Sequence, residues 1–234
     1  MAVCYMDLLD SFLSYYNCEL DIQAFFGAFY SDGCISRPGS GGNSRFQFSQ
    51  GFGNRAGRTY FDLVFFPMMA MLAPRFRSTL FPDVTSSSKK GVVSSSWILV
   101  SCRSVHWTAL YHLTYVKGIK VLPQWLADSF NEVFIAYFAM GDGSWQYTSG
   151  MMFCTNSFHS ECLGVLQSVF LRHGITTVVR DYEQMKDGRM GRILFIRKGD
   201  TASMLRMQDI ARRHFCPEMM YRAGLNPDGT PFSE

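Results

Sequence analysis

Two aspartates stand out because each closes a long apolar stretch and is followed by glycine. Residues 25–33 read Phe-Phe-Gly-Ala-Phe-Tyr-Ser-Asp-Gly, and residues 135–143 read Ile-Ala-Tyr-Phe-Ala-Met-Gly-Asp-Gly. Each stretch is apolar almost all round, which predicts a helix buried on most sides and ended by its glycine. A carboxylate at the negative end of a helix is electrostatically misplaced unless a cation accompanies it. Asp32 and Asp142 are therefore candidate ligands of a hard cation such as Mg²⁺.

The elements that must position these aspartates follow the same order after each Asp-Gly pair. In the first half we expect a hairpin over 34–50 with a polar tip at 38–43, a helix over 59–80, a loop over 85–91, a strand over 92–102 and a helix over 105–115. In the second half we expect strands within 144–155, a helix over 160–173, a hairpin over 175–197 and a helix over 201–214. The chain therefore reads as two copies of one unit, and packing of the two apolar helices would bring both aspartates together.

Cysteine and histidine spacing excludes the common metal and disulfide classes. The seven cysteines form no Cys-x-x-Cys pair and their number is odd, so we expect reduced, mostly buried thiols. The five histidines are scattered, which disfavours a zinc site. No uncharged apolar run is long enough to cross a bilayer, so we expect no membrane partner. The N-terminus lacks the basic region of a signal peptide, and we expect the product to be used where it is made.

The two motifs and their flanks resemble those of the LAGLIDADG homing endonucleases, in the form that carries two repeats on one chain. Over residues 20–224, four more segments resemble family signatures in the same order. They are Phe-Gln-Phe-Ser-Gln at 46–50, Lys-Val-Leu-Pro at 120–123, Cys-Thr-Asn-Ser-Phe at 154–158 and Pro-Glu-Met-Met-Tyr-Arg at 217–222.

This resemblance implies an α/β (α+β) fold. Two αββαββα-like repeats would be related by a pseudo-two-fold axis, with antiparallel sheets forming a DNA-binding saddle around two central motif helices. The implied boundaries are an N-terminal extension at 1–19, repeats at 20–115 and 131–224, a linker at 116–130 and a tail at 225–234.

The resemblance also implies the residues of an active site. Asp32 and Asp142 would bind the metal, with the backbone carbonyls of Ser31 and Gly141 as further ligands. Two more pairs of residues have implied roles: Gln50 and Asn156 would hold water or metal near the scissile phosphate, and Lys120 and Arg222 would be the basic residues of the site. The implied reaction is Mg²⁺-dependent phosphodiester hydrolysis, with Mn²⁺ as a substitute, giving a staggered double-strand break with 3′ overhangs.

The second half departs from the family pattern at several positions. Gly141 stands where an acidic residue is common, Asn156 replaces glutamine, and Arg222 replaces lysine; arginine keeps the charge but cannot act as a titratable base. We therefore expect the second active site to be slower than the first. Tyr137 also replaces the small residue that Gly27 supplies in the first motif.

Two ribbons of the predicted fold carry side chains suited to reading DNA. A two-stranded ribbon fits the major groove, where Arg, Gln and Asn recognise guanine and adenine edges. The candidate DNA-binding residues are Arg37, Asn43, Arg45, Gln47, Arg180, Lys186, Arg189, Arg192, Arg197 and Lys198. The formal charge of only +3 conceals this basic surface, because residues 1–36 hold five acids and no Lys or Arg, which leaves +8 on the rest. We expect DNA binding to weaken as salt rises.

Three functions stay open at the level of sequence. The first is a site-specific endonuclease acting on a long, asymmetric double-stranded DNA target. The second is an RNA maturase that assists intron splicing, a role that relatives of this fold have taken up. The third is a nuclease-inactive structural relative. Retention of both aspartates favours the nuclease; we expect a monomer, and the resemblance implies an organellar location in a mitochondrion or chloroplast.

Overall fold

The computed structural model describes residues 20–39, 42–51, 58–72, 78–89, 92–156, 158–184, 188 and 190–232. Two four-stranded antiparallel sheets share one strand order, β1-β2-β4-β3 in the first and β7-β8-β10-β9 in the second. The strands of the first sheet are β1 (Gly33–Ile35), β2 (Phe46–Gly51), β3 (Leu80–Lys89) and β4 (Val92–Ser101). Those of the second are β7 (Gly143–Gln146), β8 (Gly150–Phe153), β9 (Val178–Gln184) and β10 (Met190–Arg197). The prediction of a mixed α/β fold with antiparallel sheets is confirmed.

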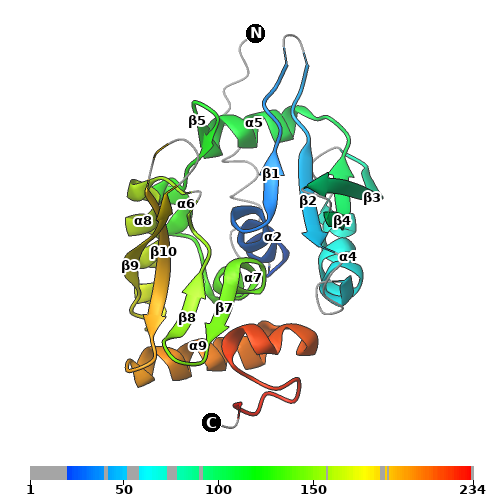
Figure 1. Ribbon diagram of the computed structural model, residues 1–234. Helices are drawn as coiled ribbons and strands as arrows, with labels where there is room; N and C mark the ends of the chain where they lie inside the picture. The colour runs from blue at the N-terminus through cyan, green and yellow to red at the C-terminus, as the bar shows by residue number, and fades with distance from the viewer. Residues whose placement is uncertain are drawn as a thin grey trace.

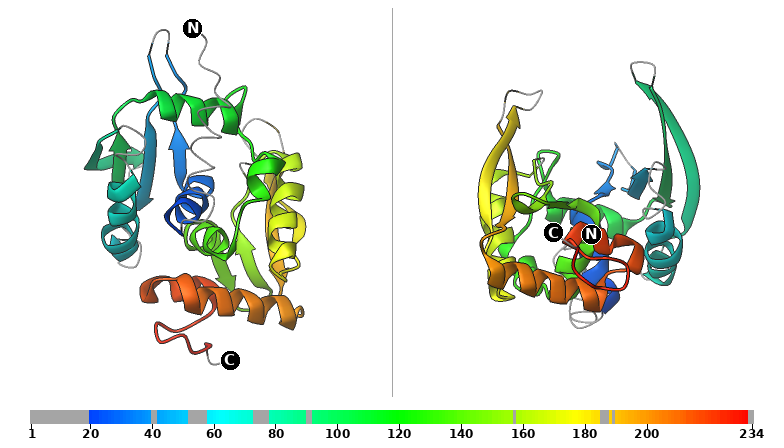
Figure 2. Two further views of the ribbon diagram at one scale, coloured as in Figure 1. Left: turned by 180° about the vertical axis from the view of Figure 1, so that it is seen from behind. Right: turned by 60° about the horizontal axis from the view of Figure 1, so that its bottom comes forward.

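The two motif helices, α2 (Leu20–Tyr30) and α7 (Glu132–Asp142), pack side by side between the sheets (Figure 1). The other helices are η1 (Tyr60–Phe65, a π-helix), α4 (Phe66–Leu72), α5 (Val105–Thr114), α6 (Gln124–Ala127), α8 (Ser160–Arg172), α9 (Thr201–His214) and η2 (Pro217–Ala223, a 3-10 helix). A short hairpin of β5 (Tyr115–Val116) and β6 (Ile119–Lys120) follows α5. In the right-hand view of Figure 2, β3–β4 and β9–β10 rise on opposite sides of the central helices, which gives a U-shaped outline.

Residue alternation along the strands defines which surface of each sheet is open. Ile35 and Phe46 pair across β1 and β2 and are buried against the helices, whereas the neighbouring pair, Cys34 and Gln47, points the other way. In the second sheet, Leu194 faces the core. Below, the open face is the side of each sheet that points away from the core. Cys34 and Gln47 lie on it in the first sheet, and in the second sheet it is the side opposite to Leu194.

The core explains why the motif helices are apolar almost all round, since aromatic side chains from both meet between the sheets. Phe25 contacts Phe46 of the first sheet with ring centroids 5.5 Å apart, and Phe26 reaches Phe130 just before α7, at 5.6 Å. Phe130 in turn stacks on Phe134 at 3.9 Å. Burial of each such aromatic ring stabilises the fold by about 2 kcal/mol. One continuous core therefore joins the two halves.

Close approach of α2 and α7 depends on small residues that face larger ones. A Cβ placed on Gly27 would lie 2.5 Å from the carbonyl oxygen of Phe134 and 2.7 Å from the Cβ of Tyr137. A Cβ placed on Gly141 would lie 2.5 Å from the Cβ of Ser31. The tyrosine in the second motif is thus accommodated because the first motif has glycine opposite it.

The first sheet differs from the sequence-based expectation in one place. The loop predicted at 85–91 is wrong as far as Lys89, because β3 continues to that residue, with Ser86 opposite Ser95 and Ser87 opposite Ser94. Strand pairing uses backbone groups, so a serine-rich segment can continue a ladder that its composition does not announce. The helix predicted over 59–80 is also too long: α4 ends at Leu72, residues 73–77 lie outside the described residues, and β3 begins at Leu80.

Three smaller expectations can be compared with the structure. All five described cysteines are free thiols, but Cys34, Cys102 and Cys154 are exposed, so the expectation of mostly buried thiols is wrong. In the segment predicted as a linker, 116–130, the chain forms β6 and α6. The N-terminal extension predicted at 1–19 lies outside the described residues. No helix in the described part of the chain has the length and apolar character needed to span a membrane.

Substitution of Gly27 tests the helix contact. We expect Gly27→Val to lower the free energy of unfolding by about 3 kcal/mol, because its side chain would meet the Phe134 carbonyl group rather than a flexible side chain. Gly164→Ala in α8 is the matched control, since no atom lies within 4 Å of its added Cβ. That variant should gain about 0.5 kcal/mol. Urea denaturation followed by circular dichroism measures both, and equal effects would contradict a tight α2–α7 contact.

Candidate active site

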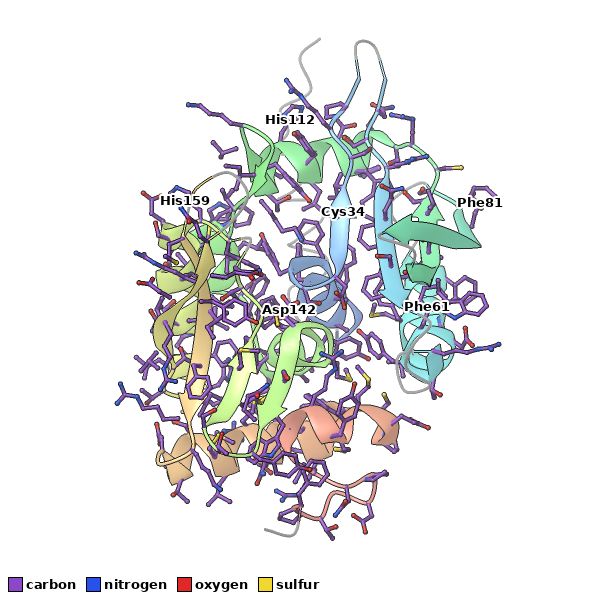
Figure 3. The ribbon with its side chains drawn as sticks, viewed as in Figure 1. Cys34, Phe61, Phe81, His112, Asp142 and His159 are labelled. Atoms are coloured by element: carbon purple, nitrogen blue, oxygen red, sulfur yellow. The ribbon has the colours of Figure 1, made fainter. Side chains whose placement is uncertain are left out.

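The two motif aspartates meet where the central helices reach the open face. Asp32 follows α2, and Asp142 is the last residue of α7. A Cβ placed on Gly141 would lie only 3.1 Å from Oδ2 of Asp32, so the carboxylate of one motif lies against the backbone of the other. Figure 3 labels Asp142 at the C-terminal end of α7, between the two sheets. The predicted convergence of the two carboxylates is what the structure shows.

Burial makes this pair electrostatically costly. Loss of solvent raises the pKa of Asp32, although Arg222 and Lys120 oppose the shift. Loss of solvent raises the pKa of Asp142 well above its ordinary value, and the neighbouring charge of Asp32 raises it further. The two basic side chains therefore do not fully compensate the two carboxylates, and an additional cation would stabilise their ionised forms.

Each basic residue of the site binds the C-terminal end of one motif helix. The Lys120 Nζ donates to the carbonyl oxygens of Phe29 at 2.7 Å and Gly33 at 2.6 Å. The Arg222 Nη1 donates to the carbonyl oxygens of Gly141 and Gly143, both at 2.7 Å. These contacts satisfy backbone acceptors left over at the helix ends and place positive charge at the negative end of each helix dipole.

Desolvation also changes the acid–base properties of the lysine. Burial lowers the pKa of Lys120 to about 8, against the attraction of Asp142 and Asp32. Arg222 occupies the matching position in the second half. The end of one motif helix is thus bound by a lysine side chain and the end of the other by an arginine side chain.

The oxygen donors of the site fit Mg²⁺. This ion is usually bound through one or two carboxylates, several waters and substrate phosphates rather than by a complete protein cage. In keeping with that pattern, the described residues include no cluster of three His, Cys, Asp or Glu that could hold a metal. Asp32, Asp142 and the Ser31 carbonyl group are available as oxygen donors, whereas the Gly141 carbonyl group already accepts a hydrogen bond from Arg222.

The two sheets differ at the positions predicted to hold water or metal. Gly33 lies opposite Phe48 in the first sheet, and Gly143 lies opposite Phe153 in the second. Strand β2 continues past Phe48 to Gln50, whereas β8 ends at Phe153 and the Thr155 N–H donates to the Phe153 carbonyl oxygen, so the register defines no counterpart of Gln50 in the second half. The side chain of Gln50 lies outside the described residues; its backbone pairs with Trp97 in β4.

Asn156, which was predicted for that role, lies one residue beyond Thr155. Its Nδ2 donates to Glu183 on β9 at 3.4 Å. Thr155 itself is buried, and its hydroxyl group donates to the Arg192 carbonyl oxygen and accepts from the Leu194 N–H, both at 3.0 Å. The hydroxyl group of Thr155 is therefore already used within the second sheet.

Four of the predicted DNA-binding residues lie on the open face. Arg45 and Gln47 alternate with the buried Phe46. The Arg45 Nε is buried without a hydrogen-bond partner among the described residues. In the second sheet, Arg180 and Arg197 lie on the side opposite to the buried Leu194. The Arg180 guanidinium lies 4.2 Å from the ring centre of Phe195.

The other predicted DNA-binding residues are placed differently. The Asn43 Oδ1 accepts a hydrogen bond from Thr108 of α5. Arg192 points to the helix side of its sheet and forms an ion pair with Asp181 at 3.1 Å, so it does not belong to the open face. Lys198 donates to the Tyr147 carbonyl oxygen. Arg37 is exposed beyond β1, and Lys186 and Arg189 lie outside the described residues.

A family model of LAGLIDADG DNA endonucleases matches residues 22–203, and the chain belongs to this family. A solved structure, the homing endonuclease I-WcaI bound to its DNA recognition sequence, superposes with a TM-score of 0.67. That match covers 92% of each chain at 14% sequence identity, and at this identity it shows a shared fold. A search of curated proteins finds no match.

The raised pKa of Asp142 predicts a stability change with a definite sign. A carboxyl group whose pKa is raised on folding stabilises the fold below its unfolded pKa, and this contribution is lost as pH rises through the folded pKa. Without divalent metal, Asp142→Asn should therefore melt at least about 3 °C above the wild type at pH 8. The gap should close as pH falls towards 4.

Asp200 provides a control of opposite sign. Its carboxylate caps α9 by accepting from Ser203, which lowers its pKa. Asp200→Ala should melt below the wild type, with the gap widening as pH rises. Differential scanning calorimetry at several pH values measures both series, and a gap for Asp142→Asn that is constant with pH would refute the assignment of an unfavourable buried charge.

Proposed function

We propose that the chain is a site-specific endonuclease that hydrolyses both strands of a long, asymmetric DNA target with Mg²⁺, for which Mn²⁺ can substitute. The observation that carries this proposal is the convergence of Asp32 and Asp142, under-compensated by neighbouring cations, at the centre of a face with basic strands on both sides. A vestigial site would gain nothing from keeping two such carboxylates, because each raises the cost of folding.

Each group of the site has a role in the proposed reaction. Asp32 and Asp142 would hold Mg²⁺ near the scissile phosphates, and the bound ion would supply Lewis-acid activation of water and stabilisation of charge on the leaving oxygen. Lys120 and Arg222 fix the ends of the two motif helices and add positive charge for the developing phosphate charge. With one carboxylate for each strand, hydrolysis gives a staggered break with 3′ overhangs.

Recognition is assigned to the open face. Arg45 and Gln47 in the first sheet, with Arg180 and Arg197 in the second, present the donor groups that read base edges in the major groove. A single chain carries both motifs and both sheets, which supports a monomer acting on an asymmetric target.

The aspartates are tested by paired substitutions. Asp32→Asn and Asp142→Asn should each abolish Mg²⁺-dependent double-strand cleavage and leave DNA affinity within about threefold of the wild type, because they remove metal ligands without touching the basic strands. Asp62→Asn, in an exposed ion pair with Arg58 on η1, is the matched control and should cut normally. Undiminished cutting by either active-site variant would refute the site.

The presence of Asn156 and Arg222 in the second half, where the first half has Gln50 and Lys120, predicts unequal cutting of the two strands. With each strand labelled separately, one should be cleaved at least about tenfold faster than the other, and a nicked product should accumulate before the double-strand break. Rapid-quench sampling measures both rates. Equal rates would contradict the inequality inferred for the two halves of the site.

The target itself is found by selecting cleaved molecules from a randomised duplex library, with Mg²⁺ in one arm and Ca²⁺ in the other. A single long asymmetric site cut only with Mg²⁺ supports the endonuclease. No cleavage, together with tight binding of intron RNA, would replace it with the maturase hypothesis.

A further inference from the structure

A basic cavity lies outside the candidate active site, at the end of the first sheet. It has a volume of about 530 Å³ and lies between the segment after β1, the C-terminal end of α5 and the β5–β6 turn. Its lining residues are Arg37, Pro38, Tyr111, His112, Tyr115, Lys117 and Gly118. Figure 3 labels His112 at the upper end of the molecule, above Cys34. No lining residue is acidic, so the cavity favours an anion.

Two tyrosines make the wall of this cavity rigid. The rings of Tyr111 and Tyr115 stack with centroids 4.7 Å apart and planes 11° from parallel. The Tyr115 hydroxyl group accepts a hydrogen bond from the Ile35 N–H at 3.1 Å, which fixes the wall to β1. The cavity is therefore preformed, and an anion bound there would be held in a fixed position relative to the first sheet.

Lys117 is held in a conformation that lysine does not favour. Among the described residues it is the one non-glycine with a positive φ, at 52°, and Gly118 beside it has a φ of 81°. This left-handed backbone costs about 1 kcal/mol for a residue with a Cβ, and Asn or Gly would adopt it more easily. Lys117 is exposed, so packing does not explain its presence in the turn. A charge required at this point does explain it.

We propose that this cavity binds a backbone phosphate of duplex DNA. The phosphate would belong to the end of the target that lies on the first sheet, beyond the bases that the strands contact. The inference rests on the proposed function. Arg37 follows β1 by two residues and also lines the cavity, so the cavity begins where the first sheet ends. Phosphate contacts of this kind fix the register of a protein on DNA and carry no sequence information.

The cavity beside β7 in the second half has a different composition. It is lined by Gly143, Ser144, Trp145, Tyr147, Cys154, Tyr221, Arg222 and Phe232. Arg222 is its one cation, and that side chain already donates to two backbone carbonyls. Among the described residues that line it, this second cavity therefore offers no further cation for a phosphate, unlike the cavity at the end of the first sheet.

The test uses Lys117→Asn, because asparagine suits the turn and removes the charge. Affinity for a fluorescent duplex of arbitrary sequence is measured between 50 and 200 mM salt. The slope of log K against log salt should fall by about 0.9, the value for one lost phosphate contact. The melting temperature should stay equal to that of the wild type or rise. Lys117→Arg should restore the wild-type slope.

Arg172→Gln is the matched control, because it removes one positive charge from α8, on the helix layer behind the second sheet, and should leave the slope unchanged. If Lys117→Asn leaves the salt dependence of duplex DNA binding unchanged, the proposal is overturned. The same holds if the variant weakens binding to a hairpin RNA but leaves the salt dependence for duplex DNA unchanged. If the wild type binds no duplex DNA at all, the proposed function itself fails, and this outcome is distinct from loss of the slope change alone.

Discussion

The contact between the two motif helices is the constraint on which the rest of the molecule depends. Only glycine at Gly27 and Gly141 lets the helix backbones approach closely enough for two carboxylates to share one site. The aromatic residues of both helices then fill the space on either side and join the two sheets through one core. The geometry of the site and the stability of the fold are therefore properties of the same contact, and neither can be changed without the other.

Lys120 and Arg222 link this contact to segments far away in the chain. Lys120 comes from β6 and Arg222 from η2, and each donates to two backbone carbonyls at the end of a motif helix. Such buried charged contacts cost desolvation, which lowers the pKa of Lys120 to about 8. The chain tolerates this cost at the one place where phosphate charge is expected to accumulate.

The sequence predicted those features that depend on local pattern. The apolar helices, their Asp-Gly ends and the repeated order of elements follow from hydrophobicity and glycine placement, and the structure agrees with them. What it did not predict depends on pairing between distant segments. The extension of β3 through serines is a matter of register, which composition does not encode. Likewise, the face occupied by Arg192 follows from its pairing with Asp181.

The Gly27–Tyr137 contact also limits what the two repeats can become. A tyrosine in place of Gly27 would clash with Tyr137, because a Cβ at Gly27 would already lie 2.7 Å from the Tyr137 Cβ. The two motif helices are therefore complementary at this contact and cannot be exchanged for one another. For the proposed endonuclease, a change of target would have to alter each sheet separately while the shared helix pair is kept.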